Sequence, residues 1–234
     1  MLHPLVHENT STLEEQRFSS TFTGEELFLN DHQVKGEKVL PGLAYLEMAR
    51  AAIEEASGST EEGQTRIQLK NVVWARPMAV GAQPQEVHIG LYPEENGEIA
   101  YEIYSKPEKN NGSATTVSRQ RLRDDMDTRI VHSQGMALFA LGSQRPQLDL
   151  KALQERCTQS VLSVDECYEV FKRMGLEYGP AHKGIEKLYV GDHEVLAQLT
   201  LPSSVSETKD QFTLYPSLLA STLQASIGIG FTNQ

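Results

Sequence analysis

The chain has few of the features that mark several common protein classes. Its 234 residues include two cysteines, Cys157 and Cys167. This is too few for a disulfide framework, and no companion His or Cys pair suggests zinc. The sequence also shows no signal peptide and no apolar run long enough to span a membrane. We therefore expect a cytoplasmic protein with no bound metal and no membrane partner.

Positive charge is scarce as well. The chain has 21 Lys and Arg against 32 Asp and Glu, for a formal net charge of -11. No basic surface offsets this excess, so nucleic acid is not an expected partner. The one basic run, Arg119 to Arg123, is followed at once by three aspartates and indicates a solvated loop. The length allows a sizeable core in one large or two small domains.

One stretch combines a histidine with a helix start. Residues 31–41 read D-H-Q-V-K-G-E-K-V-L-P, with His32 ahead of a glycine turn at Gly36 and Pro41 at the entrance of a helix predicted over 42–56. The first amides of that helix, from Gly42 onward, carry the positive end of its dipole. A base that takes a proton and amides that bind a carbonyl oxygen are therefore close in sequence.

The remaining elements predict an α+β chain with two similar halves. After the first helix, strand-like segments follow and a polar loop covers 106–128. A linker is expected at 142–150. The second half then gives a short helix at 164–174, two strands, and a proline-led apolar helix at 216–227. Expected strands cover residues 16–23, 67–74, 87–92, 99–104, 131–141, 184–190 and 195–201.

Several motifs together resemble the dehydratase domains of modular polyketide synthases. They are H-x-x-x-G-x-x-x-x-P from His32 to Pro41, His3-Pro4-Leu5, P-G-L-A-Y-L-E-M-A from Pro41 to Ala49, Tyr178-Gly179-Pro180, and Tyr215-Pro216-Ser217-Leu218-Leu219. The resemblance spans nearly the whole chain. It implies a double hot-dog fold, in which two curved antiparallel sheets each wrap around a central helix. The implied subdomains are 1–142 and 143–234, the second apparently incomplete at its C-terminus.

The resemblance also implies roles for individual residues. His32 becomes the general base, acting on an acyl thioester that the phosphopantetheine arm of an acyl carrier protein delivers, without another cofactor. Gly42 binds the thioester oxygen through its amide, and Tyr178, Pro180 and Gln224 contact the substrate. The Tyr178-Gly179-Pro180 segment also predicts a tight turn, and both interpretations can hold. The implied partners are the carrier protein, neighbouring synthase domains and a second copy in a homodimer.

The sequence departs from the family pattern at three places. The second catalytic motif of the family is D-x-x-x-Q or D-x-x-x-H, but residues 220–224 read A-S-T-L-Q, so Ala220 replaces the acid that protonates a departing hydroxyl. Such an acid is commonly worth about a hundredfold to ten-thousandfold in rate. Tyr215 stands where histidine is common, and His182 where an aromatic residue is usual. His182 is either a second proton carrier or a structural histidine, and we favour the structural role.

Three hypotheses remain open. The first, which we prefer, is an enoyl isomerase that moves a double bond from the α,β to the β,γ position and needs no leaving-group acid. The second is a dehydratase in which Ala220 is an engineered replacement of aspartate. The third is a non-catalytic scaffold, with a pyran-forming domain as a related possibility. The isomerase is preferred because Tyr215 and His182 also differ, which one engineered change would not explain. Each hypothesis places the chain in an antibiotic-type biosynthesis.

Overall fold

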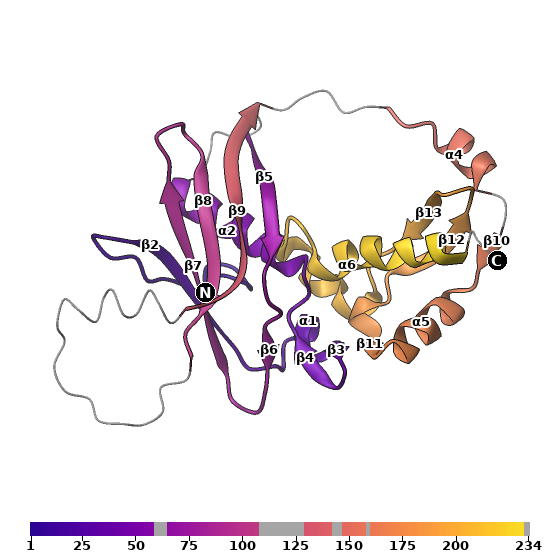
Figure 1. Cartoon of the computed structure of the whole chain (residues 1–234), viewed down its shortest axis with the longest axis horizontal. Helices are drawn as coiled ribbons and strands as arrows, with labels where there is room; N and C mark the ends of the chain where they lie inside the picture. The colour runs from indigo at the N-terminus through magenta and orange to yellow at the C-terminus, as the bar shows by residue number, and fades with distance from the viewer. Residues whose placement is uncertain (59–64, 108–128, 142–146, 158–159, 232–234) are drawn as a thin grey trace. The chain divides into compact units, whose positions relative to one another are not determined.

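The computed structural model describes residues 1–58, 65–107, 129–141, 147–157 and 160–231 (Figure 1). The chain forms two compact units that are not consecutive halves. Unit 1 comprises Met1–Thr23, Met48–Met78 and Gln83–Leu141, and unit 2 comprises Gly24–Glu47, Ala79–Ala82 and Gly142–Gln234. The expected subdomain boundary at 142/143 and most of the expected polar loop at 106–128 lie outside the described residues.

Unit 1 is built on a six-stranded antiparallel sheet with the order β1-β2-β7-β8-β9-β5. The strands are β1 Glu8–Asn9, β2 Gln16–Phe22, β7 Gln85–Pro93, β8 Ile99–Ser105, β9 Ile130–Leu141 and β5 Thr65–Trp74. All five expected strands of this half are present. The segment before β2, for which no element was predicted, is also ordered, because β1 pairs with β2 and both Leu5 and Val6 are fully buried.

Helix α2, Ala44–Ser57, supplies the apolar partner of this sheet. Its residues from Met48 onward belong to unit 1, and those on its apolar face are fully or almost fully buried: Met48, Ala49, Ala52 and Ile53. The helix begins two residues later than Gly42, because Pro41 precedes its first turn and accepts a hydrogen bond from the Ala44 N–H at 2.9 Å.

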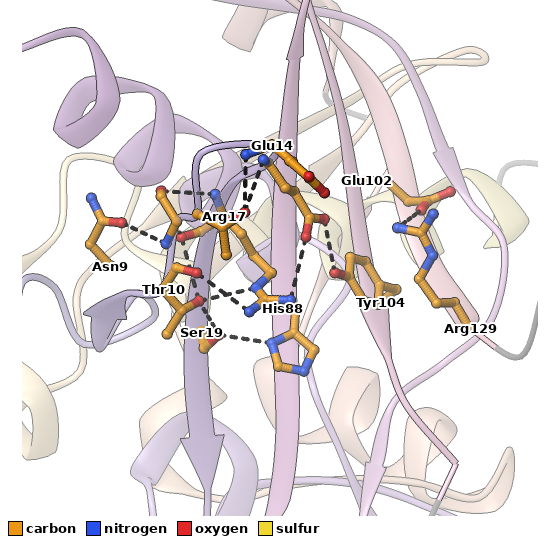
Figure 2. Close-up of polar contacts among 12 residues, drawn as sticks. Asn9, Thr10, Glu14, Arg17, Ser19, His88, Glu102, Tyr104 and Arg129 are labelled. Atoms are coloured by element: carbon orange, nitrogen blue, oxygen red, sulfur yellow. Dashed lines mark hydrogen bonds and ion pairs between the residues drawn. The ribbon is translucent and has the colours of Figure 1, made fainter. Parts of the chain in front are cut away.

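The opposite face of the sheet carries a polar group, which we call the His88 cluster: Thr10, Glu15, Arg17, Ser19, His88 and Tyr104 (Figure 2). Val87 and Ile89 point into the core, so His88 between them faces the other way. His88 Nδ1 lies 2.8 Å from the Ser19 hydroxyl, and the Tyr104 hydroxyl donates to Glu15 at 3.3 Å. Hydrogen bonding therefore satisfies polar groups that the sheet buries.

Unit 2 contains two smaller sheets. One has the order β11-β3-β4-β6 and the other β10-β12-β13. The strands are β3 His32–Val34, β4 Glu37–Val39, β6 Ala79–Val80, β10 Ser160–Leu162, β11 Leu176–Tyr178, β12 Ile185–Val190 and β13 Val195–Leu199. The helices are α1 Leu27–Asn30, α4 Leu150–Arg156, α5 Val164–Arg173 and α6 Pro216–Ala225, with 3-10 turns η1 Pro180–His182, η2 Ser203–Gln211 and η3 Ser226–Phe231.

The two long helices of unit 2 close its core. Figure 1 shows α6, in yellow, beside β12 and β13, which it contacts. The core itself gathers Cys167, Tyr168, Phe171, Ile185, Leu188 and Ala225. A capping box starts α5, since the Ser163 side chain accepts from the Glu166 N–H and the Glu166 carboxylate accepts from the Ser163 N–H. The predicted helices at 164–174 and 216–227 are thus confirmed, although α6 ends at Ala225 and continues as η3.

None of the helices described is both long and apolar enough to cross a membrane.

Candidate active site

His32 opens a tight hairpin. It is the first residue of β3, and the turn to β4 passes through Lys35 and Gly36, with φ angles of 52° and 83°. A left-handed backbone favours glycine, so Gly36 serves the turn. On its other side β3 pairs with β11, and Tyr178 stands directly opposite His32. The hairpin therefore fixes the backbone of the histidine on both sides.

The imidazole of His32 has a defined tautomer. Its Nδ1 lies 2.7 Å from the carbonyl oxygen of Val39. A carbonyl can only accept, so Nδ1 carries the hydrogen and Nε2 keeps its lone pair. Burial lowers the pKa of His32 below its usual 6.5, although the Val39 hydrogen bond opposes this shift. At neutral pH the side chain is thus a neutral base that presents Nε2.

A small cavity joins the predicted site residues within unit 2. Its volume is about 150 Å³, and its lining residues are His32, Pro41, Gly42, Leu43, Phe171, Tyr178, Ala220, Leu223 and Gln224. Four predicted residues therefore meet His32 there: Gly42, Tyr178, Ala220 and Gln224. No carboxylate is among these lining residues, and the titratable groups are the imidazole and the phenol. The cavity combines one base with apolar walls.

Tyr178 and Pro180 occupy different places. The rings of Tyr178 and His32 lie 5.6 Å apart, and burial raises the pKa of Tyr178 above its usual 10 against a hydrogen bond with Gln224. Pro180 begins η1, where its missing N–H costs nothing, and is exposed. It is not among the residues that line the cavity. The structure does not bring Pro180 together with the other predicted residues.

Both polar atoms of the Gln224 side-chain amide are hydrogen-bonded within the protein. The nitrogen donates to the His182 carbonyl at 3.1 Å, and the oxygen accepts from the Tyr168 hydroxyl at 3.2 Å. Both bonds are buried and link α6 to η1 and α5. The residue lines the cavity, but its polar atoms hold the surrounding elements together.

His182 lies directly behind the base. It is fully buried, its ring centroid is 5.3 Å from that of His32, and its Nε2 donates to the Phe28 carbonyl at 3.2 Å. Burial first, and then the charge of His32, lower the pKa of His182 to about 3. A histidine with so low a pKa is neutral at physiological pH and is a poor carrier of a proton.

Two carboxylates near the site escaped the sequence analysis. Asp31 accepts from the Ala181 N–H at 2.7 Å, and Glu47 accepts from the N–H groups of Thr213 and Leu214 at 2.8 and 3.0 Å. Glu47 thereby holds the segment that leads into α6, whose first residue is Pro216. An acid directly before the histidine, and an acid within an apolar helix, were the available signals.

Tyr215 also has a structural setting. Its hydroxyl lies 2.6 Å from that of Thr208, and its ring contacts Phe212 at 4.9 Å. It precedes α6 and does not line the cavity. Across the part of the chain that the structure describes, no three His, Cys, Asp or Glu side chains gather where they could hold a metal ion.

Comparisons with known proteins identify the family. A profile for the polyketide synthase dehydratase domain matches residues 3–106, and one for the polyketide synthase dehydratase N-terminal domain matches residues 145–234. The polyketide synthases PksN and PksM of Bacillus subtilis are 46% and 43% identical, each over 97% of this chain. The chain spans about 4% and 5% of the lengths of these two relatives.

Solved structures agree. The crystal structure of a trans-AT polyketide synthase dehydratase domain from Brevibacillus brevis is 53% identical, with a TM-score of 0.88 over 100% of this chain and 76% of that chain. The dehydratase domain from the CurF module of the curacin polyketide synthase is 23% identical, with a TM-score of 0.81 over 96% of this chain and 76% of that chain, and shows the fold. The chain therefore belongs to the dehydratase-domain family of polyketide synthases and has the hot-dog fold of that family.

Proposed function

We propose that this domain is an enoyl isomerase that moves a double bond of a carrier-protein thioester from the α,β to the β,γ position. One observation carries the proposal. The cavity presents His32 as a neutral base, while no residue that lines it has a carboxylate. A double-bond shift needs a group that takes and returns one proton, and it expels no leaving group. Dehydration needs a proton donor in addition.

The chemistry follows from the positions of the groups. Nε2 of His32 takes a proton from the γ-carbon, and electrons move toward the thioester oxygen to form a dienolate. Gly42 and Leu43 line the cavity just before α2, at the positive end of the helix dipole, which stabilises that oxygen. The imidazolium keeps its Nδ1–H bond to Val39 and returns the proton to the α-carbon. The same atoms are present before and after, so no cofactor is consumed.

Ala220 explains why we disfavour dehydration. Its methyl group lines the cavity at the position where the family motif has an aspartate, and a methyl group cannot protonate a hydroxyl. Tyr178 is the other titratable group there. Burial raises the pKa of its phenol, which makes it a weaker acid than a carboxylate by many orders of magnitude. Loss of hydroxide from a 3-hydroxyacyl thioester therefore has no carboxylic acid in the cavity lining to assist it.

The alternative is a dehydratase with an engineered alanine at position 220. The observation in its favour is the 53% identity to a dehydratase domain from Brevibacillus brevis. A non-catalytic scaffold and a pyran-forming domain are further alternatives. Proton exchange between an enoyl thioester and solvent distinguishes these alternatives from the proposal, which requires such exchange.

The test uses two substrates and two variants. Wild-type protein is incubated with an enoyl and a 3-hydroxyacyl carrier-protein thioester, and products are identified by mass spectrometry and NMR. We expect a shifted double bond from the first and no loss of water from the second. Ala220→Asp should restore little dehydration. Thr222→Asp adds the same charge to the exposed side of α6, outside the cavity lining, and serves as the matched control.

Strong dehydration by Ala220→Asp, absent from Thr222→Asp, contradicts the isomerase and supports the disabled dehydratase. A wild-type protein that leaves the enoyl thioester unchanged, with no deuterium taken up at its α- or γ-carbon, supports the scaffold.

The same proposal includes the setting of the domain. We place it in the cytoplasm, within a synthase for an antibiotic-type product, beside neighbouring synthase domains and as a homodimer. Substrate arrives on the phosphopantetheine arm of the acyl carrier protein. Light scattering at several concentrations tests the dimer, and comparison of a carrier-protein thioester with a free pantetheine thioester tests the carrier as partner.

A further inference from the structure

Two segments of unit 2 that are far apart in sequence are joined by hydrogen bonds beside the base. Asp31 receives two of them: its carbonyl accepts from the Gly179 N–H at 2.8 Å and its carboxylate from the Ala181 N–H at 2.7 Å. A third runs from His182 Nε2 to the Phe28 carbonyl at 3.2 Å. Residues 28–32 and 178–182 thus form one connected structure, which we call the Asp31 clamp.

The clamp is also tight in space. A Cβ added at Gly179 would lie 2.4 Å from Cγ of Asp31 and 2.6 and 2.7 Å from its two carboxylate oxygens. Contacts this short do not occur, so a side chain at position 179 would force either the Asp31 carboxylate or the turn to shift. The backbone is not the reason, because Gly179 has a φ of -78° that any residue can adopt. The carboxylate of Asp31 therefore packs directly against the turn that follows Tyr178.

That turn carries one wall of the cavity. Tyr178 is the register partner of His32, their rings are 5.6 Å apart, and both line the cavity, whereas Asp31 does not. The carboxylate of Asp31 is bound one turn beyond Tyr178, at Ala181. Its hydrogen bond to Ala181 therefore acts on the cavity through the position of this turn.

We propose that Asp31 is a positioning residue: its carboxylate holds the 178–182 turn so that Tyr178 faces His32 across the cavity at a fixed distance. The inference rests on the proposed function, since it concerns the geometry of the same base. What the clamp fixes is the direction from which the acyl chain reaches Nε2. A displacement of about 1 Å in such a site can cost about a hundredfold in rate.

The first experiment compares three variants of the full chain. Asp31→Ala removes the acceptor, Asp31→Asn keeps an oxygen for the Ala181 N–H but loses the charge, and Asp192→Ala removes an exposed aspartate from the β12–β13 turn as a control. Isomerisation kinetics and amide hydrogen exchange of Gly179 and Ala181 are measured for each. We expect kcat to fall about tenfold to a hundredfold in Asp31→Ala, more than KM changes, with faster exchange at Ala181. Asp31→Asn should recover most of the kcat and most of the exchange protection at Ala181. Asp192→Ala should match wild type in both measurements.

The second experiment is a double-mutant cycle between the two sides of the clamp. Gly179→Ala alone should displace the turn and lower kcat, because its methyl group overlaps the carboxylate of Asp31. In the Asp31→Ala background that carboxylate is absent, so adding Gly179→Ala should cost little more. The effects of the two changes should therefore be far from additive, which is the sign of direct contact.

Each result has a clear reading. Asp31→Ala with the kcat of wild type overturns the inference, even if its melting temperature falls. An Asp31→Asn variant that is as impaired as Asp31→Ala also overturns the inference, because the charge of Asp31 and not the position of the turn would then matter. Additive effects in the double-mutant cycle overturn it as well. A wild-type protein that dehydrates and does not isomerise overturns the proposed function instead. The comparison is then run on dehydration, which needs the same base.

Discussion

Two histidines in this chain, the half-buried His32 in unit 2 and the buried His88 in unit 1, look alike by several measures. Burial is the main cause that lowers the pKa of each, and each has its Nδ1 in a hydrogen bond, His32 with the Val39 carbonyl and His88 with the Ser19 hydroxyl. Their other nitrogens differ. Nε2 of His88 lies 3.7 Å from the Glu86 carboxylate, whereas His32 belongs to a cavity lining without any carboxylate.

The comparison shows what distinguishes a candidate base from a structural histidine. His88 lines neither the cavity at Gly42 and Ala220 nor a larger one of about 650 Å³ at residues 11–16 and 91–93. Its ring contacts Tyr104 at 5.3 Å and fills space on the sheet. A lowered pKa and burial are common to both, so neither identifies a site. The feature that identifies a candidate base is a ring nitrogen with a lone pair in a residue that lines a cavity.

The largest expected effect separates the two histidines directly. His32→Ala should reduce deuterium uptake at the α- and γ-carbons of an enoyl thioester by about a hundredfold to ten-thousandfold, because the base is lost. His88→Ala should lower the melting temperature and leave the rate per folded molecule unchanged. NMR of the thioester in deuterated buffer measures the first effect and calorimetry the second. An equal loss of deuterium uptake in both variants would contradict the distinction between His32 as the base and His88 as a structural histidine.

A second prediction uses His182, which is fully buried, whereas His32 is half-buried. Its pKa is about 3 in the folded state and near 6.5 unfolded, so between these values the unfolded chain binds more protons. Folding stability therefore falls as pH drops through this window, by up to about 1.4 kcal/mol per pH unit, and is independent of this group above pH 6.5. His182→Phe removes this contribution to the pH dependence of stability. In urea unfolding, the free energy of unfolding of the variant should rise relative to that of wild type as the pH falls below 6.5. Parallel pH profiles of the two proteins would contradict this.

The smallest effect concerns the His88 cluster. Tyr104→Phe removes the hydroxyl that donates to Glu15 at 3.3 Å and keeps the ring against His88. Glu15 stays partly exposed and can bind water instead, so the free energy of unfolding should fall by about 0.5–1.5 kcal/mol. Proton exchange at the enoyl thioester should not change. A rate loss larger than twofold would mean that the polar face of unit 1 matters to the chemistry after all.

The sequence predicted elements that carry local signals. The helices at 42–56, 164–174 and 216–227 show apolar faces, proline starts or caps, and the longer strands alternate, so their existence was predictable within a few residues. The short strands were not predicted, because two or three residues have no period: β1, β3, β4, β6, β10 and β11. His32 was found through the spacing of its own hairpin, with Gly36 and Pro41 nearby.

Contacts made by distant residues could not be predicted. Asp31 and Ala181 are 150 residues apart and Glu47 and Thr213 are 166 apart. The placement of each acid was the one local signal, and it did not indicate which backbone amides the carboxylate binds. The setting of Gln224 is of the same kind, since its amide is used by His182 and Tyr168. Its predicted contact with substrate, and those of Gly42, Tyr178 and Pro180, stay predictions.

The hydrogen bond from His32 Nδ1 to Val39 has a stereochemical consequence. With Nδ1 anchored to Val39, only Nε2 can act as the base, so in the proposed isomerisation the same nitrogen takes the γ-proton and delivers it to the α-carbon. Both steps of the proposed reaction then take place on one face of the planar dienolate, and we expect a suprafacial migration. When the proton is returned faster than it is lost to solvent, a deuterium placed stereospecifically at the γ-carbon reappears at the α-carbon of the same molecule with a single configuration.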